Sequence, residues 1–188
     1  MAASARSRRF GRVLAVACAL LPGVALPDAV RAEGPPEAAV KATYLYKFAP
    51  FVTWPDAGAT GPLTVCVVGE DPFGPLLDRA VAGQTLGGRA IQVAHIETIG
   101  PRSACDIAYL GGSRVESVAE ALRAVRGTPI LTVTDEGDPA GIIAFAAADG
   151  HVRFRIDQVQ AQENGLVISS KLLSLALSVH AAPGQVQP

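Results

Sequence analysis

The sequence predicts an α/β fold: a single domain with a central, largely parallel sheet flanked by helices. Short apolar runs rich in Val and Ile, bounded by Gly, Pro and Asp, alternate with segments whose apolar residues recur every three or four positions. Strands that alternate with helices in this way form βαβ units, whose strands are parallel. The last third of the chain departs from this alternation and predicts a β-hairpin followed by a buried C-terminal helix.

Residues 1–32 predict a signal peptide. Four arginines from Arg6 to Arg12 precede an apolar stretch over 13–26 and small residues that end at Ala32, the order typical of a secretory signal. The apolar stretch is shorter than the roughly 20 residues that a membrane span needs. We therefore expect cleavage after Ala32 and a periplasmic mature domain over 33–188.

The charge of the mature chain bears on its partners. Cleavage removes five of the 16 basic residues and one of the 17 acidic residues, which leaves 11 basic and 16 acidic residues and a net charge of −5. Nucleic acid is excluded as an expected partner, because phosphate binding needs clustered Lys and Arg.

The first half of the mature chain predicts two helices and two strands. Apolar residues spaced by three and four over 37–51 predict an amphipathic helix, which Pro55 stops. Residues 63–69 form a Val-rich run typical of a buried strand. A short helix over 75–81 begins with proline at its first turn, and residues 90–96 predict the second strand.

The next segment predicts a third strand, a helix and a fourth strand. Residues 105–110 and 129–134 are the two apolar runs. The helix between them is expected over 115–125, with Ser113 as its N-cap and Glu116 completing a capping box.

The hairpin is predicted from strand-like runs over 142–147 and 151–156, on either side of Asp149-Gly150. Both turn residues tolerate positive φ, as the tightest hairpin turns require. Asp157 is then expected to cap a short helix that ends at Glu163.

The last helix is predicted to open at Ser169 or Ser170 and to run through His180. Leucine, alanine and valine occupy nearly every face of this segment. A helix that is apolar all round is buried, by its own domain or by a partner.

Two cysteines, Cys66 and Cys105, remain after processing. An even number of cysteines in an oxidising compartment predicts a disulfide. Two buried free thiols are the alternative.

No catalytic pattern emerges from the sequence. The three histidines share no metal-ligand spacing with one another or with the cysteines. Neither a nucleophile elbow nor a dinucleotide-binding glycine motif follows a strand. We expect no enzyme activity, no cofactor and no metal; for the acidic loop with Asp135 and Asp138, calcium is conceivable, but a solvated loop is the commoner arrangement.

Two places qualify as candidate ligand sites. Asp71 and Phe73 lie just after the first buried strand, where an open α/β sheet places its ligand crevice; an ordinary strand-to-helix turn is the alternative. Arg153 and Arg155 lie on one face of a strand and suit a small anion or an acidic partner. Their alternative is a solvated strand face.

Phe51 and Trp54 form a candidate partner-binding edge at the end of the first helix. Trp54 is the only tryptophan of the chain, and aromatic side chains at the end of an element serve as interface anchors. Packing in the core is an equal alternative.

Several segments together resemble the YfiR-like family, in the right order over nearly the whole mature chain. They are AVKATYLYKF at 39–48, FVTWP at 51–55, LTVCVVGEDPF at 63–73, CDIAYL at 105–110, PILTVTD at 129–135 and ISSKLL at 168–173. The resemblance implies a periplasmic α/β protein without known catalysis and a disulfide between Cys66 and Cys105. Lys171, in the last of these segments, and Leu173, in the apolar C-terminal helix, are further candidate partner-binding residues.

The resemblance also implies partners. The best-understood member of the family represses an inner-membrane diguanylate cyclase by binding its periplasmic part, and an outer-membrane lipoprotein relieves that repression. We therefore expect a regulator that occludes an inner-membrane signalling protein in cyclic di-GMP (c-di-GMP) signalling, with a homodimer as a further expectation. The alternative is a periplasmic sensor of a small molecule.

Overall fold

A computed structural model describes residues 37–55 and 61–182. All of them belong to one compact unit that begins at Glu33. The predicted signal peptide lies outside the described residues.

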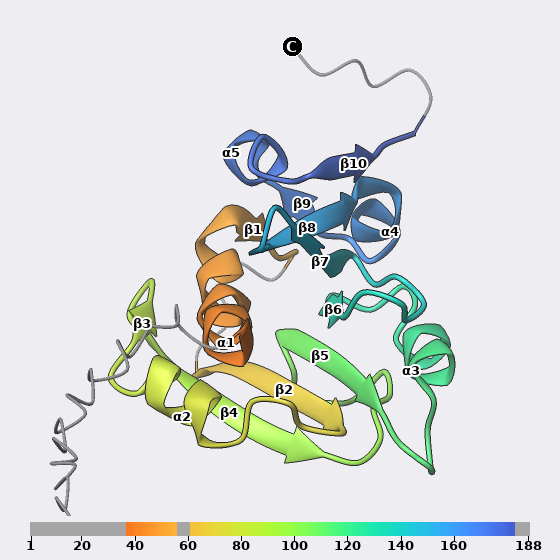
Figure 1. Cartoon of the computed structure of the whole chain (residues 1–188). Helices are drawn as coiled ribbons and strands as arrows, with labels where there is room; N and C mark the ends of the chain where they lie inside the picture. Colours follow the sequence, from red (N-terminus) through yellow and green to blue (C-terminus); the bar gives the residue numbers. More distant parts are fainter. Residues whose placement is uncertain (1–36, 56–60, 183–188) are drawn as a thin grey trace, which may run out of the picture. The chain divides into compact units, whose positions relative to one another are not determined.

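The core of the domain is one eight-stranded sheet (Figure 1), in the order β10-β8-β7-β6-β5-β2-β4-β3. Strands β2, β4, β5, β6 and β7 are parallel, β8 returns antiparallel to β7, β10 is parallel to β8, and the short β3 is antiparallel to β4. The predicted α/β fold with a largely parallel sheet is therefore confirmed. The bounds are β2 Leu63–Gly69, β3 Thr85–Leu86, β4 Arg89–Ile96, β5 Ile107–Gly112, β6 Leu131–Thr134, β7 Ile143–Ala148, β8 His151–Asp157 and β10 Ser178–His180.

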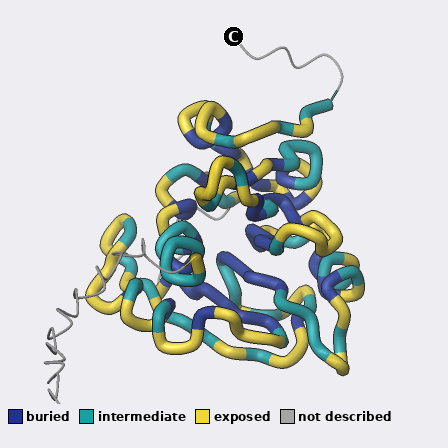
Figure 2. Tube along the Cα trace, in the orientation of Figure 1, coloured by how far each residue is buried: buried dark blue, intermediate teal, exposed yellow. Residues whose placement is uncertain are grey.

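Helices cover both faces of the sheet. Side chains on alternate positions of a strand point to opposite faces, so Val65 and Val67 pack toward helix α1 (Glu37–Phe48), while Cys66 and Val68 pack toward α3 (Val118–Ala124). Helix α2 (Pro75–Val81) packs on the α1 side. Buried residues follow the central strands, as Figure 2 shows.

A two-stranded antiparallel sheet joins the two ends of the domain. It consists of β1 (Val52–Thr53), which follows the 3₁₀-helix η1 (Ala49–Phe51), and β9 (Val167–Ile168). Just after β9, the Ser169 N–H donates to the Phe51 carbonyl at 2.8 Å. The segment before β9 contains helix α4 (Gln158–Glu163), and the predicted cap is confirmed: Asp157 accepts from the Gln160 N–H at 2.9 Å.

The predicted C-terminal helix through His180 is wrong in its extent. Helix α5 covers only Ser170–Leu173, and the chain then continues into β10. At the entry to β10 the Leu177 N–H donates to the Phe154 carbonyl of β8 at 2.8 Å. A short apolar run can form either a buried helix or a strand. Here the end of the run forms a strand, because the edge of β8 offers it hydrogen-bond partners.

The predicted N-terminus of α3 is also wrong. Ser117, not Ser113, is the N-cap, and it forms a capping box with Glu120. Ser113 accepts from the Val115 and Glu116 N–H groups at 3.1 Å and so closes a local turn. Such turns compete with helix formation. Glu116 does not complete a capping box with Ser113, because its carboxylate accepts from the Ile99 N–H of another loop at 2.9 Å.

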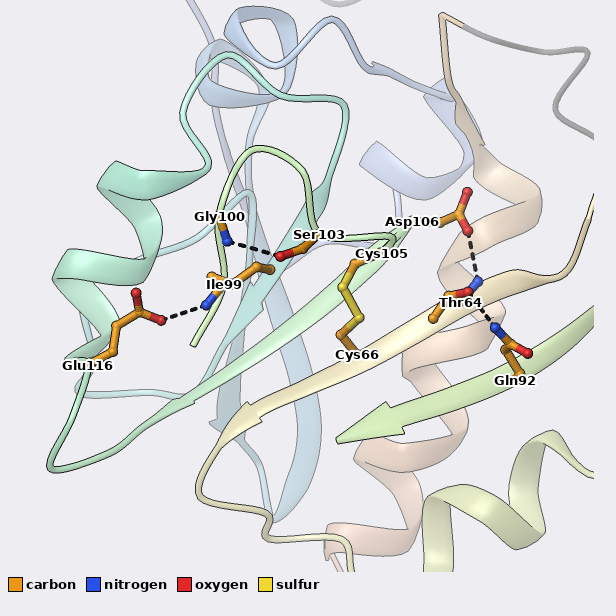
Figure 3. Close-up of a disulfide and its surroundings, with 9 residues drawn as sticks. All are labelled: Thr64, Cys66, Gln92, Ile99, Gly100, Ser103, Cys105, Asp106 and Glu116. Carbon is orange, nitrogen blue, oxygen red and sulfur yellow. Dashed lines mark hydrogen bonds between the residues drawn. A yellow bond between two sulfur atoms is a disulfide. The ribbon is translucent and has the colours of Figure 1, made fainter. Parts of the chain in front are cut away.

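The predicted disulfide is confirmed. Cys66 of β2 and Cys105, just before β5, are bonded with a Cα–Cα distance of 5.8 Å (Figure 3). The bond joins the middle of β2 to the segment just before β5, on the face of the sheet that α3 covers.

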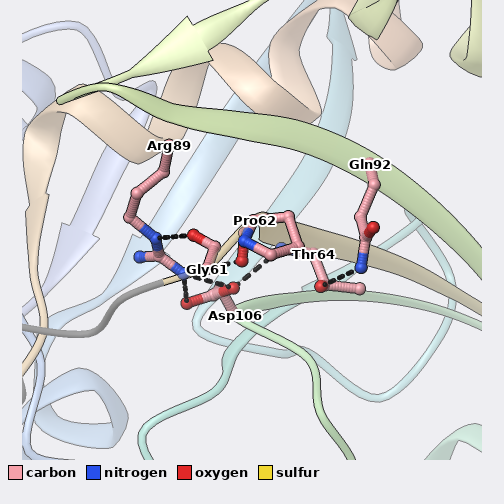
Figure 4. Close-up of polar contacts among 6 residues, drawn as sticks. All are labelled: Gly61, Pro62, Thr64, Arg89, Gln92 and Asp106. Atoms are coloured by element: carbon pink, nitrogen blue, oxygen red, sulfur yellow. Dashed lines mark hydrogen bonds and ion pairs between the residues drawn. The ribbon is translucent and has the colours of Figure 1, made fainter.

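A polar cluster joins the starts of three strands, β2, β4 and β5 (Figure 4). Asp106 accepts from the Thr64 N–H at 2.7 Å and from the Arg89 guanidinium at 3.1 Å, while Arg89 also donates to the Gly61 and Pro62 carbonyls at 2.8 and 2.9 Å. One half-buried carboxylate thus organises the starts of β2, β4 and β5.

Replacing Asp106 with alanine is expected to lower the free energy of unfolding by about 2 kcal/mol, because the Thr64 N–H and the Arg89 guanidinium lose their acceptor. Urea unfolding measures the change. Glu37→Ala is the control: Glu37 is itself exposed, and its ion pair within the described residues is with Lys41 one turn away, so its loss should cost below about 0.5 kcal/mol. Equal losses in the two variants would contradict a special role for Asp106.

Candidate interaction site

The backbone is hydrogen-bonded at the carboxyl end of the sheet, where the ligand crevice is expected. In strand order, β2 lies between β4 and β5, so the switch point that binds ligands in this class of sheet falls between β2 and β5. There the Glu70 N–H donates to the Gly112 carbonyl at 2.7 Å. The ends of β2 and β5 are thus joined by their backbones, and Glu70 and Gly111 line a small cavity there.

The two candidate ligand residues near this point have local partners. Asp71 accepts from the N–H groups of Phe73 and Gly74, at 2.7 and 3.2 Å, and so shapes the turn into α2. Phe73 is buried and packs edge-on against the Tyr109 ring, with 4.7 Å between centroids. Asp71 and Phe73 thus both lie in the strand-to-helix turn, and Asp71 also lines a cavity.

A shallow acidic cavity of about 270 Å³ lies beside this turn, lined by Asp71, Tyr109, Asp135 and Asp138 among others. Asp135 accepts from the Tyr109 hydroxyl at 2.8 Å and pairs with Lys41 at 2.7 Å. Burial, together with the bond to Asp135, raises the pKa of Tyr109. Burial lowers the pKa of Lys41, but its bonds to Asp135 and Glu37 outweigh this effect and raise it.

These shifts hold Tyr109 and Lys41 protonated, so neither is available as a nucleophile or a general base near neutral pH. Over residues 37–55 and 61–182, no group of three or more His, Cys, Asp or Glu side chains is placed to hold a metal ion. In the same part of the chain, no helix combines the length and apolar character that a membrane crossing requires.

Arg153 and Arg155 lie on the open face of β8. Their cross-strand neighbours on β7 are Ala146 and Ala144, which are too small to cover the two guanidinium groups. Arg155 is 3.4 Å from Glu136, and both side chains are about half exposed. Arg153 is exposed and has no ion-pair partner among the described residues.

The candidate partner-binding residues split into two groups. Phe51 and Trp54 are half-buried against the main core, and the Lys171 ammonium lies 5.7 Å from the centre of the Phe51 ring. Leu173 is 7% exposed and belongs to the core. A substitution at Leu173 therefore changes folding before it changes any contact with a partner.

The exposed apolar side chains are instead Leu175 and Leu177, which are 54% and 43% exposed, and Val167. Val115 is the other large apolar residue exposed in the described part of the chain. We call residues 167–177 the C-terminal apolar segment. The sequence analysis did not identify these leucines as exposed. It predicted a buried helix as far as His180, in which every leucine was expected to be buried.

The comparisons with known proteins agree with the resemblance in the sequence. A search of curated proteins finds no match. Residues 38–177 match the model of the family described as YfiR/HmsC-like, which covers α1 through the C-terminal apolar segment. On the strength of that match, over well more than half of its length, the chain belongs to the YfiR/HmsC-like family.

Proposed function

We propose that the protein is a periplasmic regulator of c-di-GMP signalling that binds the periplasmic part of an inner-membrane diguanylate cyclase and represses it. Family membership supports regulation rather than catalysis. The disulfide supports an oxidising compartment. An outer-membrane lipoprotein that sequesters the regulator, and a homodimer of the regulator, belong to the same proposal.

The observation that carries the proposal is the exposure of Val167, Leu175 and Leu177 on one short stretch of chain. Exposed apolar side chains that gather in one region mark protein interaction sites. Phe51, Trp54 and Lys171 adjoin this stretch, because β1 pairs with β9 and Lys171 lies over Phe51. The net charge of the mature chain favours a partner with a basic surface.

The small-molecule alternative has less support at its expected site. Phe73 is buried, and the cavity of about 270 Å³ at the switch point is small and lined by several carboxylates. Protein binding is therefore the function that the geometry supports best.

The test measures c-di-GMP in the native host. Deletion of the gene is expected to raise c-di-GMP, and the wild-type protein should restore the normal level. The variant Leu175→Ser/Leu177→Ser should restore it at most partly and should recover less cyclase by co-purification from the inner membrane. Because both side chains are exposed, thermal unfolding of the purified variant should match the wild type to within a few degrees.

Val115→Ser is the matched control, since Val115 is 69% exposed and lies outside the C-terminal apolar segment. It should restore c-di-GMP fully. An unchanged c-di-GMP level after deletion would refute the proposed function, and full restoration by the double variant would refute the site.

A further inference from the structure

Strand β4 leaves most of its outer edge unpaired at one end of the sheet. The short β3 pairs only with Arg89 and Ala90, the first two residues of β4 (Figure 1). No other strand among the described residues pairs with β4 on that side. Residues 91–96 therefore have β2 as a neighbour on one side and no strand on the other.

The Ile91 N–H shows which residues of β4 face this edge. It donates to the carbonyl of Gln84, just before β3, at 3.1 Å, so the backbone groups of Ile91 point away from β2. Because peptide groups alternate sides along a strand, the N–H and C=O groups of Val93 and His95 point the same way. An unpaired row of this kind is a template for another strand.

The pairing with β2 agrees with this direction. The Thr64 N–H donates to the Asp106 carboxylate at 2.7 Å, and the Thr64 carbonyl accepts from the Asp106 N–H at 2.9 Å, so Thr64 turns toward β5. Val65, the next residue, therefore turns toward β4. In a parallel pair a residue bonds the two neighbours of its register partner, and the partner of Val65 is Val93. The residues on either side of Val93 thus bond β2, and Val93 itself faces outward.

This edge lacks the features that usually prevent strand addition. Natural edges are protected by lysine, proline, bulges or covering loops. Residues 91–96, IQVAHI, include no lysine or proline, and their register with β2 is uninterrupted. Val93 lies on the α2 face of the sheet and Ala94 and Ile96 on the α3 face, and all three are half-buried. An added strand would therefore gain backbone hydrogen bonds and cover apolar side chains on both faces.

The charge on the α2 face of the edge selects the incoming side chains. His95 is exposed there, and its ring nitrogens lie 3.6 Å from Asp71 and 4.0 Å from Asp78. Asp78 is 59% exposed. The cation that follows it, Arg79, is about 200° around the helix from the buried Leu77 and so points away from the sheet. The face that would flank an added strand is thus acidic.

A second copy of the chain fits this edge poorly. Two β4 strands related by a two-fold axis would bring Asp71 and Asp78 of one copy toward the same carboxylates of the other, and like charges across a strand pair are unfavourable. A lysine or arginine directly opposite His95 would instead approach both carboxylates, because opposite side chains on neighbouring strands lie about 5 Å apart. Charge complementarity therefore favours a basic segment of a different protein.

We propose that the outer edge of β4 binds an extended basic segment of a partner protein as an added strand. The lysine or arginine side chains of the segment lie on the α2 face, toward Asp71 and Asp78, and alternate with apolar side chains that pack over Ala94 and Ile96. The inference does not depend on the proposed function, because β4 lies at the opposite end of the sheet from β10, which follows the C-terminal apolar segment.

Two nine-residue peptides with blocked ends test the charge preference, one alternating lysine with valine and the other glutamate with valine. By fluorescence polarisation, the mature protein should bind the basic peptide at least about tenfold more tightly than the acidic one, and salt should weaken the binding. Asp78→Asn should weaken binding of the basic peptide about threefold. Glu163→Gln is the matched control, since it removes the same charge from an exposed residue of α4, and it should leave binding unchanged.

Hydrogen exchange tests the backbone pairing. When the basic peptide binds, exchange at the Val93 and His95 amides should slow at least about tenfold, because the added strand pairs them. The Gln92 and Ala94 amides bond β2 already and should change much less, so they serve as an internal control.

Methylation of the peptide nitrogens separates pairing from charge without altering the protein. An added strand turns the N–H of every second residue toward β4. Methylating all the lysine nitrogens of the peptide backbone, or all the valine nitrogens, should therefore abolish binding in one case and be tolerated in the other. Which of the two peptides fails also reports whether the added strand is parallel or antiparallel to β4.

The proposal is overturned by equal binding of the acidic and basic peptides, by equal effects of the two methylations, or by unchanged exchange at Val93 and His95. It is also overturned if the protein alone sediments as a dimer in which both amides are already protected, since a second copy would then occupy the edge. Leu175→Ser/Leu177→Ser should leave peptide binding unchanged. Failure of the peptides would leave the proposed function standing, and an unchanged c-di-GMP level after deletion would leave this edge standing.

Discussion

Replacing both Cys66 and Cys105 with alanine is expected to lower the free energy of unfolding by about 4 kcal/mol. The bond closes a loop with a sequence separation of 39 residues, and in the chain-entropy model the unfolded chain regains that much freedom when the bond is lost. Since small domains are stable by only about 5–15 kcal/mol, the variant should lose a large share of its stability. Urea unfolding, extrapolated to water, measures it.

A matched control is the wild-type protein in excess reducing agent, which removes the bond and leaves both sulfurs in place. It should lose nearly as much stability as the double alanine variant. Because Cys66 is 1% exposed, the alanine variant should lose slightly more, through the small cavity at that position. A loss below about 1 kcal/mol in both cases would mean that the strand pairing and the Asp106 cluster hold β2 and β5 without the bond.

The elements that the sequence predicted best are those determined by local chemistry. Strand β2 and helix α2 have the predicted bounds, since turn residues delimit the strand and Pro75 begins the helix. The hairpin turn has positive φ at both Asp149 and Gly150, at 53° and 71°. The Asp157 cap likewise depends on residues within three positions of each other.

The errors arose where distant parts of the chain compete for a segment. Residues 174–180 have the composition of a buried helix, but the chain turns after α5, and residues 178–180 pair with the free edge of β8 as β10. The two-residue strands β1 and β9 exist only because residues 52–53 and 167–168 meet in the folded domain. No periodicity within either segment specifies that pairing.

The candidate interaction site shows the same limit at the level of single residues. Phe51, Trp54 and Lys171 were identified from the sequence, and the structure places them around one edge. Leu173 and Leu175 could not be told apart, because in a run that is apolar on every face burial depends on where the helix ends. The structure ends α5 at Leu173 and leaves Leu175 exposed.

Replacing Gly69 at the carboxyl end of β2 with alanine is expected to lower the free energy of unfolding nearly as much as loss of the disulfide. Gly69 has φ +79°, and a Cβ there would lie 2.2 Å from the Gly112 carbonyl oxygen. Gly69→Ala must therefore adopt a strained backbone conformation and also push apart the chain that the bond between Glu70 and Gly112 holds together. The free energy of unfolding should fall by about 3–4 kcal/mol, from the left-handed conformation and the overpacking together.

Gly83→Ala separates the two causes. Gly83 has nearly the same φ, +72°, but nothing lies within 4 Å of an added Cβ, so this variant should lose only the 1–2 kcal/mol or so that an L-residue pays for that conformation. Urea unfolding of both variants gives the difference directly. If it is about 2 kcal/mol, the close approach of β2 and β5 holds the two strand ends together at the switch point. Equal losses would instead show that the switch point opens at little cost, which would return a small-molecule site to consideration.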